Sequence, residues 1–347
     1  MFQTSQRTEM RCLITGGAGF VGSNLAASLI SEGHCVSVID NLQREGTAKN
    51  IQWLASIGKY EFQQNDIRNR GFCDELIQSF KPDVIFHLAG QVAMTTSLKD
   101  PRDDYETNVT GTINILEIVR KKLPECVFAF ASTNKVYGDL SQISTSEQDT
   151  RFVPDTNLRA FDEYLPLNFK SPYGCSKGAA DQYVLEYARA YGLRTFVFRH
   201  STIYGGKQLS SYDQGWIGWF ASEAVAQLYD PTKSFSISGS GKQVRDILHV
   251  NDVISLYKCL LEKKQHAYGE AFNIGGGLEN SISINELVDL LETKLDHKLN
   301  TYHISERHCD QRYYVSQINK AVTAFNWKPT ISISSGIDEV LSKVKNT

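Results

Sequence analysis

Short apolar runs alternate with segments of helical periodicity along most of the chain. The apolar runs predict buried strands at residues 11–17, 35–40, 60–66, 83–90, 127–133, 194–201 and 270–277. Apolar residues recur at helical spacing between them, in residues 20–33, 71–80, 105–122, 175–191 and 249–264. Strands that alternate with helices are typical of a parallel sheet covered on both faces. The pattern therefore predicts a doubly wound α/β fold.

The alternation is interrupted after Tyr204. Residues 205–245 are rich in Gly, Ser and aromatic residues, and the pattern in 283–347 predicts two helices and a short strand pair. We expect residues 205–245 and 279–347 to form a smaller mixed α/β lobe. Residues 11–204 and 246–278 then form the larger lobe. We expect residues 1–10 to form a polar, disordered tail, which lacks the apolar stretch of a secretory signal.

Charge and cysteine content exclude several classes of function. The 347 residues include 36 Lys and Arg against 39 Asp and Glu, a net charge of −3. Surfaces that bind nucleic acid or anionic membranes need a basic excess, so neither partner is expected. No apolar run approaches the ~20 residues of a membrane span. The seven cysteines are odd in number and lack a CxxC pair, which indicates reduced thiols of a cytoplasmic protein and neither disulfides nor a metal site.

A glycine-rich turn joins the first predicted strand to the first predicted helix. Its sequence, GGAGFVG (16–22), has the spacing GxxGxxG. Such glycines allow a tight turn, close approach of a pyrophosphate and close packing of helix on strand. The helix N-terminus adds free N–H groups for phosphate. The turn therefore predicts a dinucleotide site.

Acidic residues at the ends of the next two strands extend this site. Asp40 is placed to bind ribose hydroxyls and to repel a 2′-phosphate, which favours NAD over NADP, although nearby Arg44 weakens that preference. Asp66 is placed to reach the adenine amino group, with a helix N-cap as its alternative role. We expect cofactor contacts from Gly16, Gly19, Phe20, Val21, Gly22, Asp40, Asn41, Asp66 and Ile67.

Tyr173 and Lys177 form a YxxxK motif at the start of a predicted helix, where the i, i+4 spacing places both on one face. A tyrosine with a pKa near ~10 is a poor base at neutral pH. A lysine ammonium and a positively charged nicotinamide would stabilise the phenolate, and lowering the pKa by ~3 units takes roughly 4 kcal/mol. A core Tyr beside a surface Lys is the alternative. Thr133, which ends a predicted strand, offers a hydroxyl that can bond to a substrate hydroxyl.

Together, the glycine turn, Thr133 and the YxxxK motif resemble the extended short-chain dehydrogenase/reductase family of nucleotide-sugar enzymes, from Arg11 to the C-terminus. The resemblance implies that Thr133, Tyr173 and Lys177 are catalytic. Tyr173 would remove a hydroxyl proton as hydride passes to NAD, and Lys177 would also hold the nicotinamide ribose. The segment HLAGQ (87–91) and an Asn that opens a long helix add four cofactor contacts, namely Leu88, Ala89, Gly90 and Asn108.

The C-terminal third resembles the same family. GSGKQVRD (239–246) resembles its nucleotide-diphosphate clamp, and Arg307 with DQR (310–312) resembles a later charged cluster that also faces the nucleotide. Arg suits bidentate pairing with phosphate, whereas a surface ion pair is the alternative for Arg245, with Asp246, and for Arg312. The expected substrate contacts are Gln91, Thr133, Asn134, Thr202, Gln208, Arg245 and Arg312.

The residues after Thr133 bear on the reaction. Dehydratases of the family carry Asp-Glu there, and Asn134-Lys135 cannot perform the same paired proton transfer, so epimerisation with tightly held NAD is expected. The segments GQVAMTTS, STNKVYGD, SPYGCSKGAADQY and YDQGWIGWF resemble family members that invert C2 of a CDP-linked 3,6-dideoxyhexose for O-antigen synthesis. A 4-epimerase and a non-catalytic dinucleotide-binding protein remain alternatives. The helices at 105–122 and 175–191 are those such enzymes use to dimerise, which implies a homodimer or homotetramer.

Overall fold

The computed structural model describes residues 9–262, 268–307 and 310–346. Its largest element is a seven-stranded parallel sheet with the order β12-β8-β5-β4-β1-β2-β3. The strands are β1 (Arg11–Thr15), β2 (Cys35–Asp40), β3 (Glu61–Gln64), β4 (Val84–His87), β5 (Val127–Thr133), β8 (Thr195–His200) and β12 (Glu270–Ile274). This order is that of a doubly wound dinucleotide-binding sheet. The predicted fold class is confirmed.

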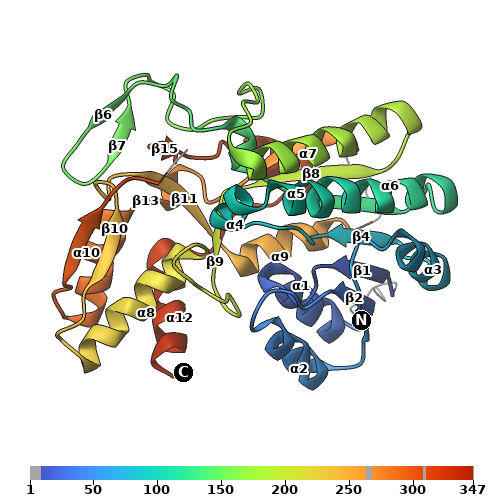
Figure 1. The fold of residues 1–347 in the computed structure, drawn as a ribbon, viewed down its shortest axis with the longest axis horizontal. Helices are drawn as coiled ribbons and strands as arrows, with labels where there is room; N and C mark the ends of the chain where they lie inside the picture. The colour runs from blue at the N-terminus through green and yellow to red at the C-terminus, as the bar shows by residue number, and fades with distance from the viewer. Residues whose placement is uncertain (1–8, 263–267, 308–309, 347) are drawn as a thin grey trace, which may run out of the picture.

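Helices cover both faces of this sheet (Figure 1). One face packs against α1 (Phe20–Ser31), α2 (Thr47–Ile57) and α9 (Val250–Cys259), and the other against α3 (Arg70–Phe80), α6 (Gly111–Lys122) and α7 (Ser171–Tyr191). Strand residues alternate between the two cores, so that Leu13 joins one core while Cys12 and Ile14 join the other. The contiguous apolar runs of the sequence reflect this burial on both faces.

The segment that precedes α6 is helical over most of its length. It consists of α4 (Met94–Lys99), α5 (Pro101–Asp104) and a π-helical turn, η1 (Tyr105–Thr110). The helix expected at 105–122 is therefore present as this turn and α6, and Asn108 lies in its π-helical part. Such turns are frequent at functional sites.

The smaller lobe lies on one side of the sheet and contains α8 (Trp216–Tyr229), α10 (Ile284–Leu295) and α12 (Ile333–Lys345) (Figure 1). β10 (Phe235–Ser238) pairs with β14 (Thr301–Ile304), and β11 (Val244–His249) pairs with β9 (Thr202–Tyr204), β13 (Ser281–Ser283) and β15 (Tyr313–Tyr314). The hairpin β6 (Thr145–Glu147) and β7 (Phe152–Pro154), the short helices η2 (Asn134–Tyr137) and η3 (Leu278–Asn280), and α11 (Asn319–Phe325) complete the described elements. Ile217, Phe220, Leu287 and Ile337 belong to the core of this lobe.

Several sequence expectations differ from these elements. The pattern missed α2 and α8, and the described part of residues 283–347 has three helices where two were predicted. Its two strands also join different sheets and do not pair with each other. Phe325 of α11 and the following Trp327 pack in the core of the larger sheet. The proposed boundaries of the lobes stay a prediction.

Some predictions concern residues outside the described part of the chain. These are residues 1–8 of the predicted tail, the last two residues of the predicted 249–264 helix, and Cys309. Met10, at the end of that tail, packs against the sheet core and donates its N–H to Nδ1 of His34 at 3.2 Å. A search of the described helices for one with the length and hydropathy of a membrane span finds none.

Candidate active site

The carboxyl ends of the central strands border a cavity of about 780 Å³. Twelve of the residues predicted to contact the cofactor line it, namely Gly16, Gly19, Phe20, Val21, Gly22, Asp40, Asn41, Asp66, Ile67, Leu88, Ala89 and Gly90. These residues were predicted from the ends of four strands that are far apart in the chain. The parallel sheet brings them together because all its strands end at the same edge.

The glycine turn has the geometry of a phosphate cradle. Gly16 has φ +69, and a Cβ there would lie 2.6 Å from the amide nitrogen of Ala89. A Cβ at Gly22 would lie 2.3 Å from the carbonyl oxygen of Gly16, so the helix can pack this closely on the turn only with glycine at position 22. No side chain caps the N-terminus of α1, which leaves its leading N–H groups available to an anion. This cradle fits the pyrophosphate of NAD.

The two acidic strand ends are held differently. Asp40 accepts hydrogen bonds from the backbone N–H groups of Ala18 at 3.0 Å and Leu42 at 2.8 Å, so it also fixes the glycine turn. Burial raises its pKa, and these bonds oppose the rise. Asp66 is also partly desolvated, but hydrogen bonds from Arg68 and Asn41 hold its pKa below the ordinary value.

The alternative role of Asp66 as a helix cap is wrong. α3 begins after Asn69, whose side chain accepts from the N–H of Phe72 at 3.2 Å. Asp66 instead faces the cavity from the end of the third strand. Arg44 lines the same cavity and donates to the carbonyl oxygen of Leu209 at 2.8 Å.

The three predicted catalytic residues lie on β5 and α7, and none of them is among the described residues that line this cavity. Thr133 is the last residue of β5, and Tyr173 and Lys177 lie in the first two turns of α7. All three are buried, and Oγ1 of Thr133 accepts from the N–H of Lys135 at 3.2 Å and donates to Oδ1 of Asn134 at 3.4 Å. Burial raises the pKa of Tyr173 to about 12, although the Thr133 hydroxyl opposes the rise. The protein alone therefore keeps Tyr173 protonated at neutral pH.

Lys177 is also desolvated. Its Nζ lies 4.2 Å from the centroid of the Phe130 ring. Burial lowers its pKa to about 7, against the opposing charge of Asp181. The alternative of a surface lysine is wrong, because Lys177 is only 4% exposed.

Asn108 connects the end of β4 to the catalytic helix. Its Nδ2 donates to the carbonyl oxygen of Gln91 at 3.0 Å and to Oγ of Ser176 at 2.9 Å. Its Oδ1 accepts from the N–H of Gln91 at 2.9 Å. Asn108 is not among the described residues that line the cavity, and its expected contact with the cofactor stays a prediction.

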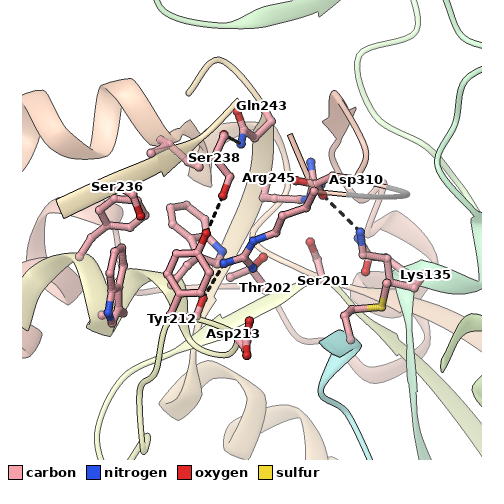
Figure 2. Close-up of a pocket in the computed structure, with 17 residues that line it drawn as sticks. Lys135, Ser201, Thr202, Tyr212, Asp213, Ser236, Ser238, Gln243, Arg245 and Asp310 are labelled. Carbon is pink, nitrogen blue, oxygen red and sulfur yellow. Dashed lines mark hydrogen bonds and ion pairs between the residues drawn. The ribbon is translucent and has the colours of Figure 1, made fainter. Parts of the chain in front are cut away.

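A second cavity of about 250 Å³ adjoins the first. Ser201, Thr202, Asp213 and Trp216 line both, so the two cavities meet at these residues. The second cavity is rich in charge, with Lys135 and Arg245 both reaching Asp310 (Figure 2). Such a site suits a diphosphate, and one of its lining residues, Asn134, directly follows Thr133.

Arg245 is held by this cluster. It donates to Oδ1 of Asp310 at 2.5 Å and to the carbonyl oxygen of Gln311 at 2.7 Å. The alternative ion pair with Asp246 is wrong, because Asp246 is fully buried and accepts from Oγ of Ser201 at 2.5 Å.

The structure brings most of the predicted substrate residues to the two cavities. Gln91, Thr202 and Gln208 line the larger cavity, and Asn134, Thr202 and Arg245 line the smaller. Thr133 lies next to Asn134 at the end of β5. Arg312 is not among the described residues that line either cavity. Its side chain is exposed, with the guanidinium carbon 5.3 Å from the centroid of Phe152.

Other lining residues were not in the predicted set. Arg307 lines the smaller cavity, and its guanidinium lies 4.5 Å from the centroid of the Tyr212 ring. Tyr212 in turn bonds to Oγ of Ser238 at 3.0 Å (Figure 2). The sequence signals for these contacts were the cluster after residue 306 and the aromatic segment 212–220. Neither indicated which side chains point inward.

Comparisons with known proteins agree with this geometry. A sequence profile described as GDP-mannose 4,6 dehydratase matches residues 13–340. The chain is 49% identical to CDP-paratose 2-epimerase of Salmonella typhi, over 95% of this chain and 98% of that protein. It is 33% identical to a putative UDP-glucose 4-epimerase of Methanocaldococcus jannaschii, over 96% of this chain and 98% of that protein.

Solved structures show the same fold. UDP-glucose 4-epimerase of Thermotoga maritima, with UDP-glucose, superposes with a TM-score of 0.84 at 27% identity, over 97% of this chain and 99% of that one. dTDP-glucose 4,6-dehydratase of Bacillus anthracis, with NAD, gives a TM-score of 0.81 at 29% identity, over 97% of both chains. The chain therefore belongs to the GDP-mannose 4,6-dehydratase family of extended short-chain dehydrogenases/reductases, whose members are NAD-dependent nucleotide-sugar epimerases and dehydratases.

Proposed function

We propose that the protein is an NAD-dependent epimerase that inverts C2 of CDP-paratose to give CDP-tyvelose. The observation that carries this proposal is the 49% identity to CDP-paratose 2-epimerase along 95% of the chain. The residues after Thr133 support it, because Asn134 and Lys135 lack the paired carboxylates with which an Asp-Glu dehydratase eliminates water.

The proposed reaction is an oxidation at C2 followed by a reduction at the same carbon. Tyr173 takes the proton of the C2 hydroxyl as hydride leaves C2, which gives a 2-keto sugar. The sugar then presents its other face, hydride returns to C2, and Tyr173 gives the proton back. Bound NAD supplies the reversible hydride acceptor, so the overall reaction consumes no redox equivalent.

Each catalytic residue has a distinct part in this proposal. The hydroxyl of Thr133, which lowers the pKa of Tyr173, would bond to the substrate hydroxyl and relay its proton to Tyr173. The ammonium of Lys177 favours the tyrosinate and binds the nicotinamide ribose. Because burial raises the pKa of Tyr173 to about 12, the positive charges of Lys177 and the oxidised nicotinamide have to stabilise the phenolate together.

The smaller cavity would hold the nucleotide diphosphate together with the sugar attached to it. Three cationic side chains, Lys135, Arg245 and Arg307, line it against the two carboxylates of Asp213 and Asp310, which leaves an excess of positive charge for a diphosphate. Because the two cavities meet at shared lining residues, the sugar would extend from the diphosphate toward the bound NAD. We further propose that the enzyme acts in the cytoplasm as a homodimer or homotetramer, in the supply of O-antigen sugars for lipopolysaccharide.

The test is turnover of CDP-paratose by the purified protein without added NAD. Proton NMR should show the C2 proton signals of CDP-tyvelose growing at the expense of those of CDP-paratose. Denaturation of the protein should release NAD, which mass spectrometry can detect. No conversion of CDP-paratose, together with turnover of another nucleotide sugar, would refute the substrate assignment.

A 4-epimerase is the second candidate, favoured by the superposition on UDP-glucose 4-epimerase with a TM-score of 0.84. The two reactions differ in the carbon that inverts. Incubation with UDP-glucose and NMR of the product separate them, because inversion at C4 gives UDP-galactose.

A further inference from the structure

One apolar side chain in the smaller cavity has no part in the proposed mechanism. Met94 begins α4 and lines this cavity together with Asn134, Lys135, Ser201 and Thr202. The other apolar lining residues among those described belong to α8 and α10 of the smaller lobe, namely Trp216, Trp219, Phe220 and Ile284. Met94 is thus the apolar group that the larger lobe contributes.

Met94 lies close to the start of the catalytic helix. Its sulfur accepts a hydrogen bond from Oγ of Ser171 at 3.6 Å. Ser171 precedes Tyr173 by two residues, and its Oγ also accepts from the N–H of Gly174 at 3.2 Å. Ser171 has φ +67, a conformation that disfavours residues with a Cβ. Strained positions of this kind persist at functional sites.

The chemistry of the thioether restricts what can lie against it. A methionine packs well against methylene and methyl groups and adapts to their shape. It offers a buried hydroxyl only a weak acceptor, so the hydroxyl would lose hydrogen bonds to water without adequate replacement. A 3,6-dideoxyhexose carries a methylene at C3, which is bonded directly to C2, the carbon that reacts beside Tyr173.

We propose that Met94 is a specificity-determining residue that contacts the C3 methylene of the sugar and disfavours substrates with a hydroxyl at C3. This inference rests on the proposed function and assigns recognition of C3 of the sugar to Met94. An apolar site rejects an added hydroxyl only about 100-fold, so the preference is expected to be of that order.

The experiment compares two substrates that differ only at C3. These are CDP-paratose and CDP-6-deoxyglucose, which keeps the C3 hydroxyl. The wild-type enzyme should favour CDP-paratose in kcat/KM. Met94→Gln should reduce this preference about 10-fold or more, because the amide can bond to the hydroxyl and packs less well on a methylene. Met94→Leu should keep the preference, because its side chain stays apolar.

The matched control is Leu98→Gln. Leu98 lies on the same helix, is 51% exposed and lines neither cavity, so the preference should not change. Met94→Gln should also keep its bound NAD and its affinity for CDP, which lacks the sugar. An unchanged preference in Met94→Gln, or an equal loss on both substrates, would overturn the proposal.

The two proposals can fail separately. If the wild-type enzyme turns over neither substrate, the proposed function is refuted, and the binding constants of the two nucleotide sugars test Met94 directly. Tighter binding of CDP-paratose that disappears in Met94→Gln would support the role of Met94. Equal binding of both by the wild-type enzyme would overturn it.

Discussion

A buried ion pair between Asp181 and Arg199 lies close to the predicted catalytic residues. Asp181 is one helical turn beyond Lys177 on α7, and Arg199 is on β8. The two side chains are 0% and 4% exposed and share two hydrogen bonds of 2.9 Å. Asp181 also accepts from Oγ of Ser132 at 2.7 Å. The carboxylate therefore joins the catalytic helix to the strand end that carries Thr133.

Removing one charge of this pair should be strongly destabilising. Asp181→Asn keeps the shape and an acceptor for Ser132 but leaves the buried guanidinium of Arg199 without a counter-charge. Breaking a buried pair in this way typically costs about 3–5 kcal/mol in the free energy of unfolding. A second substitution, Arg199→Met, removes the uncompensated charge, so the double variant should recover most of the loss.

Urea unfolding followed by circular dichroism measures these effects. The matched control is Glu186→Gln, which breaks the Glu186–Arg189 pair on the same helix. That pair is 57% and 62% exposed, so its loss should cost less than about 0.5 kcal/mol. A cost below about 1 kcal/mol for Asp181→Asn, or a double variant less stable than the single one, would refute the reasoning.

The same substitution should change the pH dependence of catalysis. Burial lowers the pKa of Lys177 to about 7, and the charge of Asp181 opposes that shift. Without the carboxylate, the pKa of Lys177 falls further, so the ammonium is lost at lower pH. The alkaline limb of kcat should therefore move to lower pH in Asp181→Asn. An unchanged limb would mean that Asp181 acts on stability alone.

Three further substitutions test the catalytic and cofactor sites. Tyr173→Phe should reduce turnover about 100-fold or more while NAD stays bound, as measured by NMR and by the NAD released on denaturation. Gly22→Ala should yield protein without NAD, because the new Cβ would lie 2.3 Å from the carbonyl oxygen of Gly16. Lys177→Met should abolish activity yet stabilise the protein in urea. The pKa of Lys177 is about 7 in the folded protein and ~10.4 in the unfolded chain. Burial of the charged lysine therefore lowers the free energy of unfolding fully below pH 7, and this loss fades as the pH rises toward the unfolded pKa. The increase in stability in Lys177→Met should thus be larger at pH 6 than at pH 9.

The sequence predicted well the elements whose signals are local. The strand predicted at 35–40 coincides with β2, because a strand buried on both faces is a continuous apolar run. α2 was missed because few of its side chains are buried, with Leu54 the main apolar one. α8 was missed for the opposite reason, since its apolar residues surround the helix and no single face stands out.

The contacts that close the substrate site depend on pairing between distant segments. The sequence identified a charged cluster around residues 307–312, and the structure directs Arg307 into the cavity and Arg312 away from it. The backbone at Arg312 accepts from the N–H of Val244, which fixes the register of β15 on β11. A shift of one residue in such a register exchanges the faces on which side chains lie. Because that register is set by contacts across nearly 70 residues of sequence, composition and spacing could predict a diphosphate-binding charge here but not which arginine supplies it.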